Sequence, residues 1–143
     1  MHRVRPLALA ALAINLVVIL LGALVRATGS GAGCGRSWPT CNGTFLPALE
    51  GATAIEFTHR AASGVALLAV LALVWMVFRV TQRGHPARIG AVVSGISIVI
   101  EALIGAVIVL AEWVADDASV ARAVSVPIHL VSTFGLLGGL VLT

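Results

Sequence analysis

The residues best suited to chemistry in this sequence are the acid, the imidazole and the guanidinium within IEFTHRAASG, residues 55–64. Glu56 and His59 are three residues apart, so they share one face of a helix, and Arg60 follows about 100° further round. The next four side chains are small and leave room beside the imidazole for a bulky group. This pattern suits a carboxylate that handles protons beside a ligand held by the histidine.

A structural role for Glu56 is the alternative. Thr53 and Glu56 match the T-x-x-E capping box, in which the glutamate side chain satisfies free amide groups at the start of a helix. The small residues after His59 would equally permit close helix packing. The sequence alone leaves both interpretations open.

A second histidine, His129, lies in the apolar segment SVPIHLVSTFGLLGG. Counted from the expected helix caps Thr53 and Ser125, His59 and His129 lie six and four residues into their helices. The predicted difference in depth is about 3 Å, at 1.5 Å per residue. Two imidazoles at similar depth on parallel helices favour a shared ligand over two separate hydrogen bonds.

Haem is the ligand that this pair favours, with His59 and His129 as axial ligands of the iron. Its ring suits an apolar interior, and the cores of helix bundles are regular cofactor sites. Zinc or copper would need more ligands at closer spacing than Glu56 could complete. The haem propionates would then pair with arginines near the membrane surface, for which the candidates are Arg26, Arg36, Arg60 and Arg122.

The elements that must position these residues are membrane-spanning helices. The chain is 59% apolar and only 10% charged, with a mean hydropathy of +1.08, whereas soluble domains are about a quarter charged. Four segments can cross a hydrocarbon core about 30 Å thick: residues 7–25, 56–78, 89–111 and 124–143. We therefore expect an all-α integral membrane protein, a four-transmembrane-helix bundle in one domain, residues 1–143.

A cleaved signal peptide is the alternative for the first segment, but its apolar run of about 19 residues exceeds the usual 7–15.

Arginine predicts the orientation, because the chain contains no lysine. The N-terminus and the loop 79–88 are basic and therefore belong in the cytoplasm, through Arg3, Arg5, Arg79, Arg83 and Arg88. The loops 26–54 and 112–123 then face outward and carry Glu50, Asp116 and Asp117. This gives two helical hairpins with both termini cytoplasmic, in a bacterial inner membrane. The basic charge reflects topology and contact with anionic membrane lipid, so no nucleic-acid partner is expected.

The two cysteines, Cys34 and Cys41, both lie in the first outward loop, within GAGCGRSWPTCNG. A disulfide is plausible there, because the outer compartment is oxidising and the glycines supply the turns of a short closed loop. A redox-active pair, free thiols and metal binding remain as alternatives.

Glu101 is the remaining acidic residue within an apolar segment. It lies about ten residues from the outer end of its helix, hence about 15 Å deep and below the two histidines. A carboxyl group at that depth is costly unless it is neutral or paired. One interpretation places it near the haem or in a proton path, and the other makes it an interhelical hydrogen-bonding group.

Three motifs together resemble the haem A synthase family, in its N-terminal four-helix half. They are GALVRATGSGAGCGRSWPTCNG, the E-x-x-H-R of residues 56–60, and HLVSTFGLL at 129–137. The resemblance implies that Glu56 is the essential acid, that His59 and His129 are the paired haem-binding histidines, and that Cys34 and Cys41 form the loop disulfide.

The resemblance also implies the chemistry, which is oxidation of a methyl group of haem O to the formyl group of haem A with oxygen from water. The family's second four-helix half, with its own b-type haem, is missing from this sequence. We expect either a truncated chain or a half-size protein that forms a homodimer. The implied partners are cytochrome oxidase and the haem O synthase upstream.

Two other classes of function remain open. A bis-histidine b-type haem subunit that only transfers electrons would not need Glu56. A non-catalytic membrane subunit or haem-delivery partner could lose both histidines and still assemble.

Overall fold

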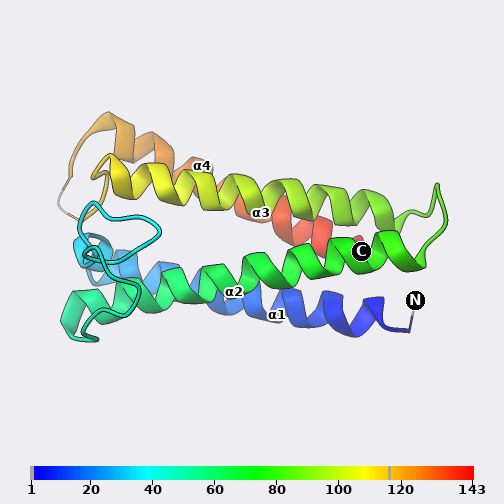
Figure 1. Ribbon diagram of the computed structural model, residues 1–143. Coiled ribbons are helices and arrows are strands. Elements are labelled where there is room, and N and C mark those ends of the chain that lie inside the picture. Colours follow the sequence, from blue (N-terminus) through cyan, green and yellow to red (C-terminus); the bar gives the residue numbers. More distant parts are fainter. Residues whose placement is uncertain (1, 116) are drawn as a thin grey trace.

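The computed structural model describes residues 2–115 and 117–143, and long helices dominate it (Figure 1). Asp116, assigned above to an outward loop, lies outside the described residues. The elements are α1 (Val4–Ala27), the short 3-10 helix η1 (Ser30–Ala32), α2 (Gly51–Val80), α3 (Ala87–Leu110) and α4 (Val120–Val141). Each of the four α-helices is long and apolar enough to span a membrane. The predicted class, an all-helical membrane protein with four spans, is confirmed.

The helices form two hairpins that pack against each other. α1 packs on α2 and α3 on α4, while α2 also contacts α3 and α1 contacts α4. The order around the bundle is therefore α1, α2, α3, α4, which places α2 and α4 on a diagonal. The loops after α1 and after α3 lie at one end of the bundle, which we call the disulfide end because the first of these loops carries Cys34 and Cys41. The two termini lie together at the other end, which we call the opposite end (Figure 1).

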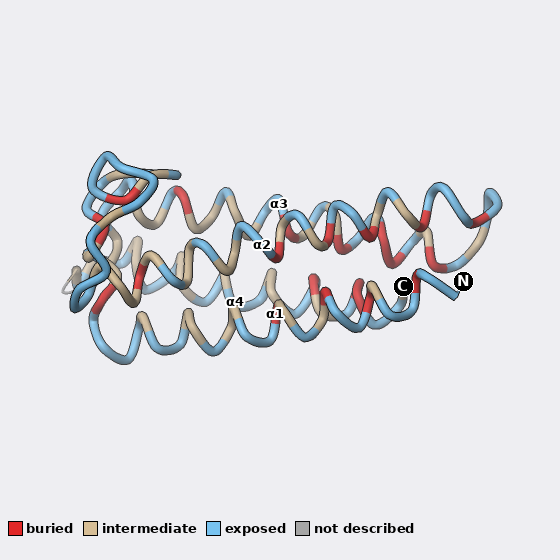
Figure 2. The backbone as a smooth tube through the Cα atoms, turned by 60° about the horizontal axis from the view of Figure 1, so that its bottom comes forward, coloured by how far each residue is buried: buried red, intermediate tan, exposed pale blue. Residues whose placement is uncertain are grey.

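The buried apolar core occupies the half of the bundle near the opposite end (Figure 2). Its residues recur at helical spacing: Val4, Ala8 and Ala11 on α1; Ala66, Val70, Leu73 and Val77 on α2; Ala87, Ala91 and Ile98 on α3; Leu136 and Leu140 on α4. In the described turns of the four α-helices nearer the disulfide end, only Glu56 and Ala106 are buried, and Ser30 is buried in η1. The protein packs tightly in one half and leaves the inward faces of the other half incompletely covered.

Two glycines allow α3 and α4 to touch near the opposite end. A Cβ atom added to Gly139 would lie 2.7 Å from Oγ of Ser94, and one added to Gly90 would lie 2.8 Å from the carbonyl oxygen of Gly139. Small residues at helix crossings let backbones approach closely within membranes. This contact anchors α4 below the segment that carries His129.

All four helices begin earlier than the segments expected from the sequence, and the change matters most for α2 and α4. α2 begins at Gly51 after Glu50, and α4 begins at Val120 after Ser119, whose side chain accepts a hydrogen bond from the Arg122 amide at 3.2 Å. The expected caps Thr53 and Ser125 therefore lie inside their helices. His59 and His129 therefore lie further into their helices than the counts from Thr53 and Ser125 predicted.

Candidate functional site

The loop between α1 and α2 is closed by a disulfide between Cys34 and Cys41, as expected. Both cysteines are fully buried. The backbone turns back beside the second cysteine, where Cys41 and Thr44 exchange hydrogen bonds of 2.8 and 3.0 Å, and Gly43 adopts a φ of +79° that favours glycine. The loop is thus a compact unit seated on the disulfide end of the bundle.

Glu56 lies beneath this loop, with only 3% of its surface exposed. Its Oε2 accepts a hydrogen bond of 2.8 Å from the Cys34 amide, and its Oε1 accepts one of 3.0 Å from Nε of Arg60 and a second from Nη2. Arg60 also donates to the carbonyl oxygens of Ser37 and Thr40. A buried ion pair is tolerated when its remaining donors and acceptors are satisfied in this way.

The capping-box interpretation of Glu56 is wrong. Because α2 begins at Gly51, Glu56 lies in the second turn, and its carboxylate binds an amide of the loop instead of the amides of its own helix. The Thr53 hydroxyl likewise donates to the carbonyl oxygen of Gly33, at 2.7 Å. A Cβ atom at Gly33 would lie 2.4 Å from the carbonyl carbon of Ala52, so only glycine lets the loop pass this close to α2.

His59 lies one helical turn from Glu56 and packs against α1. A Cβ atom added to Gly22 would lie 3.1 Å from Cε1 of its imidazole, so the ring rests on the glycine backbone. The Nδ1 atom is buried and has no hydrogen-bond partner within the described residues. A buried polar atom left unsatisfied is uncommon and points to a function or to a ligand.

His129 faces Glu101 across the α3–α4 contact. Its Nδ1 lies 2.9 Å from Oε2 of Glu101, within ion-pair distance, although the ring N–H is not aligned for a hydrogen bond. The Ser132 hydroxyl donates to Oε1 of the same carboxylate. Glu101 therefore joins α3 to α4, as one of its two interpretations predicted.

The predicted depth of Glu101 below the histidines is wrong. Since α4 begins at Val120, His129 lies nine residues into α4, and Glu101 lies nine residues before the end of α3 at Leu110. The two side chains are level with each other and in contact.

His59 and His129 face a shared region of the bundle from the diagonal helices α2 and α4. His59 lies eight residues after Gly51 and His129 nine after Val120, a difference in depth of about 1.5 Å. One imidazole whose buried Nδ1 has no partner among the described residues and a second beside a carboxylate, in a part of the bundle where few other side chains are buried, form a donor pair that fits a haem iron.

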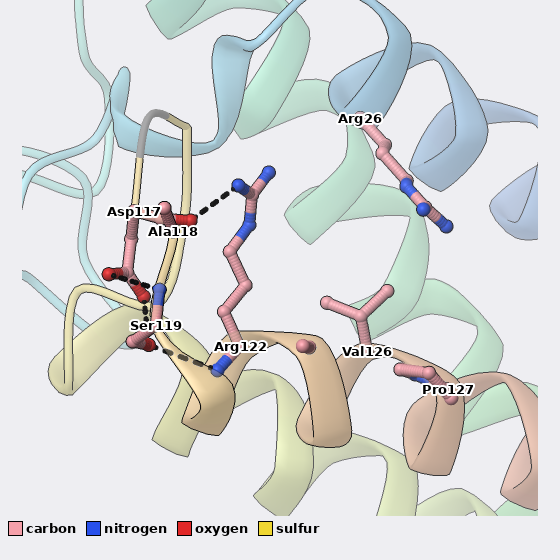
Figure 3. A pocket seen from close by; sticks show the side chains of 8 residues that line it. Arg26, Asp117, Ala118, Ser119, Arg122, Val126 and Pro127 are labelled. Carbon is pink, nitrogen blue, oxygen red and sulfur yellow. Dashed lines mark hydrogen bonds between the residues drawn. The ribbon is translucent and has the colours of Figure 1, made fainter.

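The four candidate arginines differ in their surroundings. Arg60 donates hydrogen bonds to Glu56 and to the disulfide loop. Arg36 lies 3.8 Å from Glu112 in an exposed ion pair. Arg26 and Arg122 instead line a cavity of about 320 Å³ at the disulfide end (Figure 3).

Sequence reasoning missed two parts of this site. Gly22 belongs to the run LLGALV, where a glycine among apolar residues looks like an ordinary packing residue. The Cys34 amide is a backbone group and leaves no trace in the sequence. The T-x-x-E spacing offered a local explanation for Glu56 that concealed this longer-range contact.

Comparison with known proteins identifies relatives of the chain. The COX15-CtaA family, described as cytochrome oxidase assembly protein, matches residues 5–54. A protoheme IX farnesyltransferase of Thermus thermophilus is 54% identical over 130 residues, which is 90% of this chain and 21% of that protein. No solved structure matches the chain.

Two haem A synthases give a second set of matches. That of Bacillus licheniformis is 43% identical over 95 residues and that of Bacillus pumilus 39% over 98 residues, covering 66% and 68% of this chain. The matched region is 32% of the length of each enzyme, so the chain corresponds to about a third of these relatives. By these matches and by the motifs around Cys34, His59 and His129, the chain belongs to the haem A synthase family.

Proposed function

We propose that this chain is the N-terminal half of a haem A synthase and that it forms the site where haem O is oxidised to haem A. The observation that carries the proposal is the pair His59 and His129, at matching depth on diagonal helices. Nδ1 of His59 is buried and has no hydrogen bond within the described residues, and Nδ1 of His129 lies beside the Glu101 carboxylate. His59 and His129 would be the axial ligands. The haem itself supplies the porphyrin methyl group and the redox-active iron.

The neighbours of the two histidines would keep the rings in place. Glu101 contacts Nδ1 of His129 and is itself held by Ser132, an arrangement that orients an imidazole ligand and raises its basicity. Gly22 allows the His59 ring to lie directly on α1.

Glu56 would act on protons and water beside the substrate. A carboxylate offers about four acceptor positions, and three are taken by the Cys34 amide and by Arg60. The remaining position can orient a water molecule or accept a proton one helical turn from His59. Arg60 and the disulfide loop would hold the carboxylate in place and cover it from bulk water.

The overall change is oxidation of a methyl group to a formyl group through successive hydroxylations. One water molecule is consumed in the net change and supplies the formyl oxygen. Four electrons leave the substrate, and four protons are released from the methyl group and the water together. We propose that the electrons pass to a second four-helix half carrying a b-type haem, or to a second copy of this chain.

Orientation and partners follow from the same proposal. The arginines at the opposite end favour a cytoplasmic location for both termini, and the disulfide favours an outward location for the other end. The membrane would be the bacterial inner membrane. Because the Thermus relative is named for farnesylation of protohaem IX, we propose that such an enzyme supplies the haem substrate, and that cytochrome oxidase receives the product.

A comparison of three variants tests the assignment of Glu56. The chain would be co-produced with a haem O-forming enzyme, and the bound porphyrins extracted, separated and weighed. We expect Glu56→Gln, which keeps the size and one acceptor oxygen, to retain haem O and to yield at least 100-fold less hydroxylated or formyl product. His59→Ala and His129→Ala should lose the haem itself.

The second candidate function is electron transfer by a bis-histidine haem. It is favoured by the hydrogen bonds that tie Glu56 to the loop, which could be its whole role. If Glu56→Gln forms product at the normal rate, the catalytic assignment is wrong. If even the unaltered chain carries only b-type haem, electron transfer replaces synthesis.

A further inference from the structure

The cavity at the disulfide end lies between the end of α1 and the start of α4 (Figure 3). Arg26 lines it from the last turn of α1. Arg122, Val126 and Pro127 line it from the first turns of α4, and residues 117–119 line it from the segment before α4. Its volume of about 320 Å³ is large enough for small charged groups.

The cavity is positively charged. Its lining includes one described carboxylate, Asp117, which is turned to Ser119 and accepts hydrogen bonds from that residue's hydroxyl at 2.6 Å and amide at 3.1 Å. Arg122 donates through Nη1 to the carbonyl oxygen of Asp117 at 2.7 Å, which leaves its other nitrogen atoms available. Arg26 makes no hydrogen bond or ion pair to a described side chain. The start of α4 adds the partial positive charge of a helix N-terminus.

Both arginines lie on the helical faces that lead to the histidine pair. Arg122 precedes His129 by seven residues, two turns or about 10 Å along the same face of α4. Arg26 follows Gly22 by four residues, about 6 Å along the face of α1 that touches His59. The cavity is therefore on the side of the histidine site that faces the membrane surface.

We propose that Arg26 and Arg122 bind the two propionate carboxylates of the porphyrin held between His59 and His129. This inference rests on the proposed function and names the polar end of the same site. Guanidinium groups bind carboxylates through paired, charge-assisted hydrogen bonds. The other two arginines at this end are unsuited, since Arg60 holds the loop and Arg36 faces Glu112.

The consequence is a fixed orientation of the substrate. Recognition of the propionates at the disulfide end directs the apolar edge of the porphyrin toward the packed half of the bundle. The methyl group that becomes formyl neighbours a propionate on the porphyrin ring, and Glu56 also lies at the disulfide end. The arginine pair and the acid would therefore act at the same end of the substrate.

The test is a binding titration of the full chain in lipid nanodiscs, followed by the haem absorption band. The probes are iron protoporphyrin IX and its dimethyl ester, in which both carboxylates are masked. We expect Arg26→Gln and Arg122→Gln each to weaken binding of the free acid about tenfold, and the double variant about a hundredfold. The ester should bind the unaltered chain and the double variant equally well, which also shows that the double variant is folded. Arg36→Gln is the matched control and should change neither probe.

The outcomes separate this proposal from the one on which it rests. If binding of the free acid depends on His59 and His129 but is unchanged in the double variant, the propionate assignment is overturned and the haem site stands. If neither probe depends on the histidines, the proposed function itself fails.

A lipid headgroup is the competing anion. Titrations in phosphatidylcholine and in phosphatidylglycerol discs should give the same ratio of affinities between the unaltered and the double-variant chains. An effect of the arginines that occurs only in phosphatidylglycerol would assign the cavity to lipid and overturn the proposal.

Discussion

Under the proposed function, single side chains in this site would combine a structural and a chemical task. Glu56 binds the loop through the Cys34 amide and through Arg60, yet it lies one turn from His59. Glu101 bridges α3 and α4 and also contacts the second imidazole. Substitutions of Glu56 or Glu101 therefore need control variants that change the charge of the side chain without changing its packing.

Gly22 is the residue whose size controls the position of His59. A Cβ atom there would lie 3.1 Å from the imidazole, and a larger side chain would displace the ring. We expect Gly22→Leu to weaken haem binding at least tenfold, as judged by absorption titration. Gly138→Leu, on α4 in the packed half where an added Cβ meets no other atom within 4 Å, is the matched control. Equal affinity in the two variants would show that the His59 ring does not hold the ligand.

We expect Glu101, through its contact with His129, to influence the midpoint potential of a bound haem. A carboxylate beside Nδ1 of an axial imidazole stabilises the oxidised iron. Glu101→Gln keeps the shape but removes the charge, so the midpoint potential of the bound haem should rise by about 60 mV, a tenfold change in the one-electron equilibrium. A redox titration measures this, with Ser132→Ala as the variant that removes only the hydroxyl. A potential that is unchanged in Glu101→Gln would leave Glu101 as an interhelical contact alone.

At the level of elements, the helices were predictable and their ends were not. Four apolar runs of membrane length require four helices, because hydrocarbon leaves the backbone no other means of satisfying its hydrogen bonds. The ends depend on contacts between segments. Thr53 resembles a cap in sequence but donates to Gly33 of the loop, so α2 starts at Gly51. The histidine pair could be found from residue type and spacing, whereas Gly22 and the Cys34 amide needed the packed structure.

The crossing of α3 and α4 yields a prediction about stability. A Cβ atom at Gly139 would meet both Oγ and the amide nitrogen of Ser94 within 2.8 Å, whereas one at the adjacent Gly138 meets nothing within 4 Å. Gly139→Ala should therefore lower the free energy of unfolding in detergent by about 1–3 kcal/mol. Gly138→Ala should change it by less than about 1 kcal/mol, because alanine favours the helix. Similar stabilities for the two variants would contradict the close α3–α4 contact.

The molecule as a whole divides into a tightly packed half and a half in which fewer of the described side chains are buried. The buried residues of the core gather near the opposite end, and the histidines, Glu56 and the arginine-lined cavity lie toward the disulfide end. An apolar bundle that buries few of its side chains around two imidazoles is suited to a large flat cofactor. The region matched by the haem A synthases is about a third of their length.

The most direct test is the identity of the pigment in the purified chain, produced in a bacterial membrane that contains haem O. Extraction, chromatography and mass determination should find haem O, its hydroxylated form or haem A, and the pigment should be lost in His59→Ala and in His129→Ala. Haem b alone, or a pigment that persists without either histidine, would contradict the central claim that this bundle holds the substrate of haem A synthesis between His59 and His129.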